Sequence, residues 1–366
     1  MKRILILTAG FGEGHNSAAR GIREGLAQIA PDAAEVELHD LFDDTYGVAN
    51  AWARTAYLKF IDRAPSAWGV IYRWLDRQDR FAGNFAVFFT LKNYLSRLLA
   101  RFRPDVIVSV YPAYPHMLDE MLGPTGTADY KRVVVITDSI TVNAIWYRCS
   151  ADYFLLTNDR TASVLHAAGV SPEKTRAFGF PVTPHFAELS ESREPPSAQN
   201  GRRVLYIING GKPTAPQLVR KLSALDDIQL TVTVGRDARL LRVLEEQRRE
   251  TGRAFELIDW SDDLPRLLRS SHLLISKAGG ATVQEAIAAA CPMIVNHVIP
   301  GQEEGNARFV TETNCGAIAR SVDDVVATIE KAFANDARIW REWHTNVSPL
   351  SRPAASLEIA RFLLSI

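Results

Sequence analysis

The stretch that decides the fold is Arg3-Ile4-Leu5-Ile6-Leu7-Thr8, followed by Gly10-Phe11-Gly12-Glu13-Gly14-His15 and an alanine-rich run over residues 16–29. A short apolar run bounded by glycines is typical of a buried strand, and the periodic run after it is typical of a helix. The glycines let the backbone turn tightly between the two. A strand, a glycine turn and a helix in this order begin a parallel sheet covered by helices.

The same alternation continues along the chain. Strands are predicted at residues 3–8, 36–38, 105–110, 132–137 and 153–156, and again at 203–208, 229–234, 255–258, 272–276, 292–298 and 317–320. Residues 186–202 are polar and proline-bearing, which is typical of a linker. We therefore predict an α/β protein with two Rossmann-like doubly wound domains, at residues 1–185 and 203–345. The last segment, 346–366, contains a helix that could pack back on the first domain.

Composition excludes several classes of protein. The 366 residues carry 42 basic and 42 acidic side chains, so a general nucleic-acid binder is not expected. Three cysteines without close spacing predict neither a disulfide framework nor a zinc site, and they fit a reducing cytoplasm. No apolar run reaches the roughly 18 residues of a membrane span. Any contact with a membrane is therefore expected at its surface.

His15 is the first candidate catalytic residue. It follows the glycine turn and falls in the first turn of the predicted helix, where the positive end of the dipole disfavours an imidazolium. A neutral imidazole there could accept a proton, and Gly12 and Gly14 could let backbone N–H groups face an anion. The spacing differs from the dinucleotide fingerprint, so NAD is weakly supported. The alternatives are a plain strand-to-helix connection and a solvent-facing or capping histidine.

A second glycine turn covers residues 276–285. Gly279 and Gly280 would let a diphosphate approach the backbone at a helix N-terminus. Thr282 and Glu285 have the spacing of a capping box, which would explain both as structural residues. Alternatively, a carboxylate in this turn could accept hydrogen bonds from the ribose hydroxyls.

Further turns follow other predicted strands. They contain Gly210 with Gly211, Gly235 with Arg236, and the Pro-Gly-Gln-Glu stretch at residues 300–306. Ligands bind at the carboxyl ends of strands in doubly wound sheets, so these turns could share one site. Each could equally be an ordinary loop. The chain has no Asp-x-Asp pair of the kind that holds a metal on a nucleotide diphosphate, so no metal is expected.

Residues 51–103 combine twelve aromatic side chains with ten basic ones and three aspartates. Aromatic rings with a basic surplus suit the surface of an anionic membrane. The alternative is a helical subdomain whose aromatic residues form its own core.

Taken in order, these motifs resemble glycosyltransferase family 28. The resemblance rests on Gly12-Glu13-Gly14-His15, residues 104–110, Thr137-Asp138 through Trp146, residues 234–236, the turn at residues 276–282 with Glu285, and residues 300–306. Within this MurG-like family, the monogalactosyldiacylglycerol synthases and processive diacylglycerol glucosyltransferases are the group most similar. Tyr111 stands where the galactolipid enzymes have a histidine, and Asn16 stands where they often have a basic residue. Both departures lie on the acceptor side.

The resemblance implies a GT-B fold, with two domains facing across a cleft and a metal-independent transfer that inverts the anomeric centre. It implies His15 as the base, Glu285 as the ribose ligand, residues 277–282 as the diphosphate turn, and Gln302 with Glu303 as sugar ligands. The full expected set for the UDP-sugar is Gly12, Gly14, Gly210, Gly211, Gly235, Arg236, Ser276, Lys277, Gly279, Gly280, Ala281, Thr282, Glu285, Gln302, Glu303 and Asn306. Asp138, Trp146 and Tyr111 are expected on the acceptor side.

The expected function is therefore transfer of a hexose from a UDP-sugar to a membrane lipid, with diacylglycerol the first choice of acceptor. The enzyme would work in the cytoplasm on the inner face of the cell membrane. A UDP-sugar 2-epimerase, a GT-B transferase with another acceptor, a binding protein without catalysis and a dinucleotide oxidoreductase are the alternatives. The sequence leaves open the identity of the hexose, processivity, the oligomeric state and activation by anionic lipid.

Overall fold

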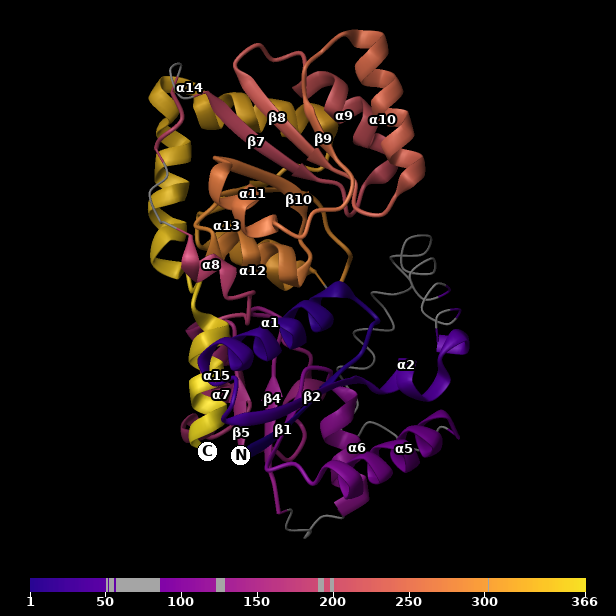
Figure 1. Cartoon of the computed structure of the whole chain (residues 1–366). Helices are drawn as coiled ribbons and strands as arrows, with labels where there is room; N and C mark the ends of the chain where they lie inside the picture. Colours follow the sequence, from indigo (N-terminus) through magenta and orange to yellow (C-terminus); the bar gives the residue numbers. More distant parts are fainter. Residues whose placement is uncertain are drawn as a thin grey trace. The chain divides into compact units, whose positions relative to one another are not determined.

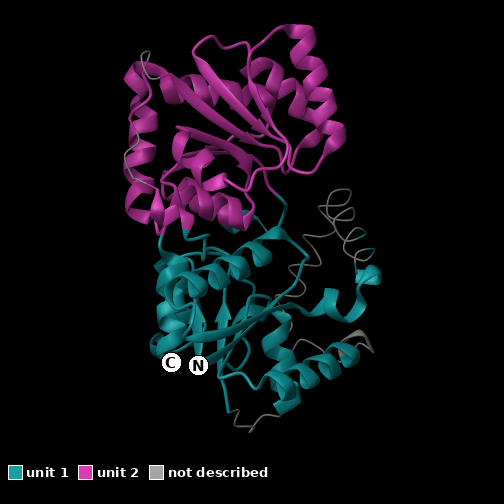
Figure 2. Ribbon diagram, in the orientation of Figure 1, with its two compact units in different colours: residues 1–184, 299–305, 354–366 teal, residues 185–298, 306–353 magenta. Residues whose placement is uncertain are grey.

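The computed structural model describes residues 1–50, 52, 56, 86–122, 129–189, 194–197, 201–301 and 303–366. The chain divides into two compact units (Figure 2). Unit 1 comprises Met1–Pro184, Ile299–Gly305 and Ala354–Ile366, and unit 2 comprises His185–Val298 and Asn306–Pro353. Each unit is built on one six-stranded sheet.

The sheet of unit 1 has the strand order β2-β1-β3-β4-β5-β6, and all neighbours are parallel. Its strands are β1 Lys2–Thr8, β2 Ala34–Asp40, β3 Val106–Ser109, β4 Lys131–Val135, β5 Tyr153–Leu155 and β6 Thr175–Arg176. The apolar residues of β1 and β3 are fully buried, as expected for central strands covered on both faces. Because β1, β3 and β4 are neighbours, the loops that follow them emerge at one edge of the sheet.

In the described part of unit 1 the helices are α1 Glu13–Ile29, α2 Leu41–Tyr46, α5 Ala86–Phe102, α6 Ala113–Leu122, α7 Asp159–Ala167 and α15 Ala355–Ser365, with short 3-10 turns η1 Ala144–Trp146 and η2 Pro172–Lys174. The C-terminal helix α15 packs against α1 (Figure 1). A Cβ atom on Gly25 of α1 would lie 2.5 Å from the carbonyl oxygen of Ser356, so glycine permits this close approach. The last helix of the chain thus completes the unit that the first strand begins.

Unit 2 repeats the parallel architecture, with strand order β12-β11-β10-β7-β8-β9. Its strands are β7 Arg202–Ile207, β8 Ile228–Thr233, β9 Glu256–Ile258, β10 Leu273–Lys277, β11 Met293–His297 and β12 Gly316–Ile318. Strands β7 and β10 are neighbours in the middle of this sheet. The connection after β7 leads to β8 on one side, and the connection after β10 leads to β11 on the other side. The carboxyl ends of β7 and β10 mark the switch point where ligands bind in folds of this kind.

The helices of unit 2 are α8 His185–Glu188, α9 Ala215–Leu222, α10 Ala238–Thr251, α11 Leu264–Ser270, α12 Gly280–Ala288, α13 Glu304–Glu312 (which begins in unit 1) and α14 Val322–Val347, with η3 Lys212–Thr214 and η4 Ser348–Leu350. Helix α14 is interrupted near its middle, where Asn335, Asp336 and Ala337 have left-handed backbone angles. Trp340, beyond this break, is buried in the core of the unit.

The predicted α/β fold with two doubly wound sheets is confirmed. Every strand predicted from the sequence is present, with ends that differ by at most two residues. The two-residue strand β6 was not predicted, because a pair of residues carries no periodic signal. No helix in the described part of the chain is long and apolar enough to cross a bilayer.

Candidate active site

In unit 1, the loops after β1, β3 and β4 bring His15, Tyr111, Asp138 and Trp146 together. The ring of His15 lies edge-on to Tyr111, with 5.4 Å between centroids, and 5.8 Å from the ring of Trp146. The indole Nε1–H of Trp146 donates a hydrogen bond to Oδ2 of Asp138 at 2.9 Å. The predicted base and the predicted acceptor-side residues are therefore one cluster.

His15 is held as a neutral imidazole. Removal from water lowers its pKa from 6.5 to about 4, and a hydrogen bond to the backbone of Val110 opposes this shift only in part. The Thr137 hydroxyl lies 3.4 Å from Nδ1 of the ring. Above pH 4 the ring is therefore uncharged and could accept a proton.

The pKa of Asp138 is shifted in the opposite direction to that of His15. Burial raises the pKa of Asp138 from 3.8 to about 6, although the hydrogen bond from Trp146 favours the carboxylate. Burial also raises the pKa of Tyr111 to about 12, so its phenol stays protonated at neutral pH. The cluster thus holds a neutral imidazole and a phenol beside a carboxyl group that ionises near pH 6.

Gly12 and Gly14 precede and begin α1. Gly12 occupies the N-cap position, where no side chain caps the helix. A Cβ atom added to Gly12 would meet nothing within 4 Å, so the backbone at this point faces open space. The first N–H groups of the helix could therefore meet a ligand next to His15.

In unit 2, Asn209 joins three of the predicted donor residues. Its Oδ1 accepts hydrogen bonds from Oγ of Ser276 at 3.0 Å and from the backbone N–H of Lys277 at 3.3 Å. Its Nδ2 donates to the hydroxyl of Thr282 at 3.3 Å. Asn209 was not among the predicted site residues, although its position directly after a buried strand was a signal that could have found it.

Gly210 and Gly211 complete the turn after β7. A Cβ atom on Gly210 would come within 3.1 Å of the side chains of Lys277 and His297, so the turn after β7 is packed tightly against that after β10. Gly211 has a left-handed φ of 65°. Glycine-rich turns therefore follow both strands at the switch point, and the turn after β7 lies against the last residue of β10.

Helix α12 starts directly after the turn that follows β10. Gly279 is its N-cap and no side chain caps it, so the capping-box interpretation of Thr282 and Glu285 is wrong. Thr282 instead binds Asn209, and Glu285 lies one turn further along α12 and is partly buried. The N–H groups of Gly280 and Ala281 belong to the first turn, which suits an anion.

The loop after β8 contains two charged side chains, Arg236 and Asp237, that contact residues of other loops. The guanidinium of Arg236 stacks on the indole of Trp260 at 4.3 Å, and Nζ of Lys212 pairs with Asp237 at 2.7 Å. Gly235 has a left-handed φ of 60°. Trp260 was not predicted as a site residue.

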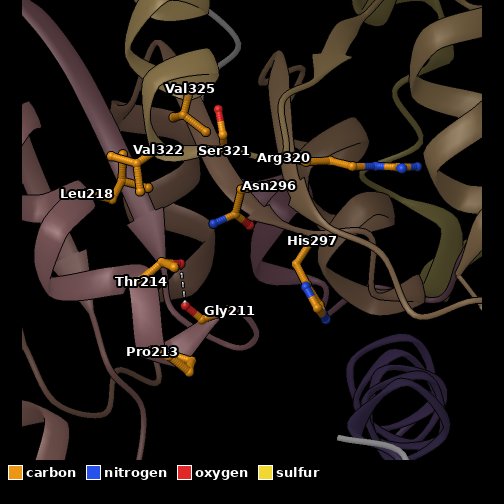
Figure 3. Close-up of a pocket in the computed structure, with 10 residues that line it drawn as sticks. All are labelled: Gly211, Pro213, Thr214, Leu218, Asn296, His297, Arg320, Ser321, Val322 and Val325. Carbon is orange, nitrogen blue, oxygen red and sulfur yellow. Dashed lines mark hydrogen bonds between the residues drawn. The ribbon is translucent and has the colours of Figure 1, made fainter. Parts of the chain in front are cut away.

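A pocket of about 240 Å³ opens beside the turn after β7 (Figure 3). Asn296 and His297, the last two residues of β11, line it together with Gly211 and Thr214. Figure 3 shows that Arg320, which also borders the pocket, points away from its centre. Sequence reasoning missed Asn296 and His297 because their strand was read as buried to its end.

The stretch at residues 300–306 behaves differently from the glycine turns. Glu303 is buried, and its Oε2 accepts a hydrogen bond from the backbone N–H of Ile299 at 3.0 Å, so it stabilises its own turn. Asn306 donates to the carbonyl of Ala278 at 3.2 Å and holds the turn before α12. Gln302 lies outside the described residues. The roles of Gln302 and Glu303 as sugar ligands stay predictions.

Among the residues described, no group of three or more histidine, cysteine, aspartate or glutamate side chains is arranged to hold a metal ion. The arrangement that is present consists of a neutral histidine in unit 1 and backbone turns with a lysine in unit 2. These groups suit proton transfer and the binding of a phosphate ester, respectively.

Comparison with known proteins agrees with this division. Residues 15–182 match the family model for monogalactosyldiacylglycerol synthase, and residues 213–341 match that for the glycosyltransferase family 28 C-terminal domain. The processive diacylglycerol beta-glucosyltransferase of Bacillus subtilis is 24% identical over 93% of this chain and 89% of its own length. Monogalactosyldiacylglycerol synthase 1 of Arabidopsis thaliana is 25% identical over 98% of this chain and 70% of its own.

Solved structures show the same fold at low sequence identity. MurG of Acinetobacter baumannii superposes with a TM-score of 0.65 and 13% identity over the whole of both chains. UDP-GlcNAc 2-epimerase of Neisseria meningitidis, solved with UDP-GlcNAc, superposes with a TM-score of 0.62 and 12% identity over both whole chains.

These findings define the class first: the chain is a glycosyltransferase with the GT-B fold. It belongs to glycosyltransferase family 28, in the group of monogalactosyldiacylglycerol synthases and processive diacylglycerol glucosyltransferases. The fold alone would not separate a transferase from an epimerase, whereas the family matches do.

Proposed function

We propose that this chain transfers a hexose from a UDP-sugar to the free hydroxyl of diacylglycerol, with inversion and without a metal. The observation that carries the proposal is the cluster of His15, Tyr111, Asp138 and Trp146 at the carboxyl edge of the unit 1 sheet. The relatives from Bacillus subtilis and Arabidopsis thaliana are both named for attaching a sugar to diacylglycerol, which supports this acceptor.

In the proposed reaction, neutral His15 removes the proton of the acceptor hydroxyl as that oxygen attacks C1 of the hexose. The bond between C1 and the diphosphate oxygen breaks on the opposite face, and UDP leaves. General-base assistance of this kind accelerates a reaction by roughly 10² to 10⁴. The proton ends on the imidazole, from which solvent can remove it because the lowered pKa makes imidazolium a good acid.

Unit 2 supplies the proposed donor site. The first turn of α12 and the side chain of Lys277 would oppose the charge that develops on the departing diphosphate. Asn209 fixes this turn by binding Ser276, Lys277 and Thr282. Glu285 is the proposed partner of the ribose hydroxyls.

We also propose that the enzyme works on an anionic membrane surface in the cytoplasm. The basic, aromatic segment at residues 51–103 supports this, although most of it lies outside the described residues. Two of its described aromatic residues, Trp52 and Phe89, are 75% and 68% exposed, and Val48, which precedes the segment, is 76% exposed. Phe102 of the same segment is instead buried in the core of unit 1. Vesicle binding should weaken as salt rises; binding that does not respond to salt would contradict an electrostatic contact.

The test of the function is UDP release together with mass spectrometry of extracted lipid. Anionic vesicles containing diacylglycerol would be offered UDP-glucose, UDP-galactose or UDP-N-acetylglucosamine in the presence of EDTA. We expect one donor to add a single sugar mass to diacylglycerol with EDTA present. Conversion of the free UDP-sugar to an epimer without lipid, or product only after a divalent metal is added, would contradict the proposal.

A further inference from the structure

Asp40 connects the glycine loop that leads to His15 with the neighbouring helix α2. Asp40 ends strand β2 and pairs in register with Thr8, the last residue of β1, so it stands beside the start of the glycine loop. Its Oδ2 accepts a hydrogen bond from the backbone N–H of Gly10 at 2.7 Å. Gly10 is buried, so this bond satisfies a donor that would otherwise be costly.

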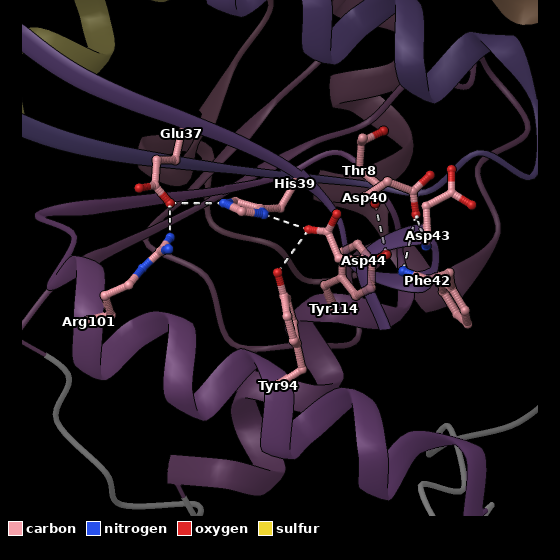
Figure 4. A network of polar contacts seen from close by, with 10 residues as sticks. All are labelled: Thr8, Glu37, His39, Asp40, Phe42, Asp43, Asp44, Tyr94, Arg101 and Tyr114. Carbon is pink, nitrogen blue, oxygen red and sulfur yellow. Dashed lines mark hydrogen bonds and ion pairs between the residues drawn. The ribbon is translucent and has the colours of Figure 1, made fainter. Parts of the chain in front are cut away.

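The other oxygen of the same carboxylate caps α2. Oδ1 accepts hydrogen bonds from the backbone N–H groups of Phe42 at 3.1 Å and Asp43 at 3.2 Å. Figure 4 shows the bonds from Asp40 to α2. Together with the bond to Gly10, one side chain therefore fixes both the start of α2 and the start of the glycine loop that leads to His15. Two separate oxygens are needed for this, which is a reason for a carboxylate at this position.

A second, apolar connection runs between the same two elements. Phe42 of α2 packs edge-on against Phe11 of the loop at 4.9 Å between ring centroids. Phe11 lies 6.2 Å from Tyr111, whose ring contacts His15 at 5.4 Å. Helix α2 therefore contacts the segment around His15 in two ways: through the hydrogen bonds of Asp40, and through the packed rings that lead from Phe42 to His15.

Helix α2 is itself held firmly on the sheet. Leu41 is fully buried, and Asp44 accepts hydrogen bonds from the imidazole of His39 at 2.5 Å and from the hydroxyl of Tyr94 on α5 at 3.1 Å (Figure 4). An anchor on a fixed element can define the position of a loop. An anchor on a loose element could not.

From these contacts we propose that Asp40 is a positioning residue for the catalytic base: its carboxylate holds the glycine loop against α2 and so keeps the ring of His15 within reach of the acceptor hydroxyl. This inference rests on the proposed role of His15. A base atom must lie within about 2.6–3.2 Å of the oxygen whose proton it removes, and a displacement of about 1 Å can cost roughly 100-fold in rate.

Asp40→Ser is the selective variant. Serine is as good a helix N-cap as aspartate, but its single, shorter hydroxyl cannot also reach Gly10. Asp105→Ser is the matched control, because Oδ2 of Asp105 accepts a hydrogen bond from the backbone N–H of Arg3 at the same 2.7 Å, at the start rather than the end of β1. Asp40→Asn, which keeps one acceptor oxygen and the original shape, serves as a second variant if Asp40→Ser does not fold.

We expect Asp40→Ser to lower kcat by about 10- to 100-fold, with the UDP dissociation constant unchanged and a melting temperature similar to that of Asp105→Ser. Hydrogen exchange at residues 10–14 should be faster in Asp40→Ser than in Asp105→Ser. Equal kcat values for the two variants, or a loss of kcat without faster exchange in the loop, would overturn the inference.

His15→Ala separates this inference from the proposed function. If His15→Ala keeps full turnover, the base assignment fails, and the exchange data alone then report whether Asp40 anchors the loop. If His15→Ala is inactive while Asp40→Ser behaves like its control, the base stands and the positioning role is wrong.

Discussion

The two units carry the same architecture but build their sites from different materials. In unit 1 the site consists of side chains, and three of them have strongly shifted pKa values: His15, lowered to about 4, Asp138, raised to about 6, and Tyr111, raised to about 12. In unit 2 the site consists of glycine turns and the start of α12, which Asn209 ties together. A shifted pKa suits a group that moves a proton, whereas backbone N–H groups suit a group that holds an anion.

This contrast predicts how the two units respond to substitution. Changes in unit 1 should reduce turnover while leaving UDP binding intact. Changes of the site residues in unit 2 should weaken UDP binding. The comparison can therefore be tested one residue at a time.

The largest effect is expected at His15. His15→Ala should lower kcat by roughly 10² to 10⁴, because it removes the proposed general base, while Asp138 is hydrogen-bonded to Trp146 and the Tyr111 phenol stays protonated. Calorimetric titration with UDP should give the wild-type affinity. A parallel loss of UDP affinity would place His15 in the binding site and remove the contrast between the units.

Asn209→Ala is the matching change in unit 2. It removes the acceptor shared by Ser276 and Lys277 and the donor to Thr282, so the two turns should lose their fixed geometry. We expect UDP to bind more weakly by about 1–2 kcal/mol, measured by titration. Asn346→Ala, which loses one hydrogen bond to the carbonyl of Asn314, is the control. Equal UDP affinity in the two variants would contradict the role of Asn209.

The pH dependence of stability should differ in sign between His15 and Asp138. A lowered histidine pKa adds stability that is fully present above pH 6.5 and is lost as the pH falls toward 4. A raised aspartate pKa does the opposite: stability falls as the pH rises from 3.8 to about 6, because the buried carboxylate ionises.

Asp138→Asn isolates the second contribution. The amide oxygen can still accept the hydrogen bond from Trp146, but no charge is buried. We expect the free energy of unfolding to rise by on the order of 2 kcal/mol at about pH 7.5 and to change little at about pH 3.5. Thermal melts at the two pH values would show it. The same shift at both would mean that ionisation of Asp138 is not the cause.

The smallest expected effect concerns the far end of α12. Ala290, just past this helix, has a left-handed φ of 50°, which glycine adopts without strain. Ala290→Gly should raise the free energy of unfolding by about 1 kcal/mol without changing UDP affinity. Gly252→Ala, at the left-handed residue that ends α10 with φ 62°, should lower it by a similar amount. Weaker UDP binding in Ala290→Gly would show that both ends of α12 matter to the site.

Many residues of the candidate site could be predicted from the sequence, because they come after apolar runs that are recognisable as strands. His15, Asp138 and Lys277 each lie at or just past the carboxyl end of a strand, and a parallel sheet brings such ends to one edge. Asn209 and Asp40 were missed as site residues for the opposite reason. Their importance comes from bonds to residues 30 to 73 positions away, and local spacing carries no record of those.

The capping-box reading of Thr282 failed for a related reason. The spacing of Thr282 and Glu285 fits a cap, but the helix begins two residues earlier, at Gly280, and Thr282 turns toward Asn209 of another strand connection. The local sequence predicted that the Thr282 hydroxyl would accept a hydrogen bond from the backbone of its own helix. In the folded protein it accepts one from the side chain of Asn209 instead.

The sequence by itself determined the α/β alternation, the two sheets and the family, because apolar periodicity, glycine turns and motifs are local signals. Only the tertiary structure decided which polar groups meet: the pairing of Trp146 with Asp138, the shared carboxylate of Asp40, and the desolvation that keeps His15 neutral. Hydrogen-bond geometry and the exclusion of water depend on positions in space, and these exist only once the chain has folded.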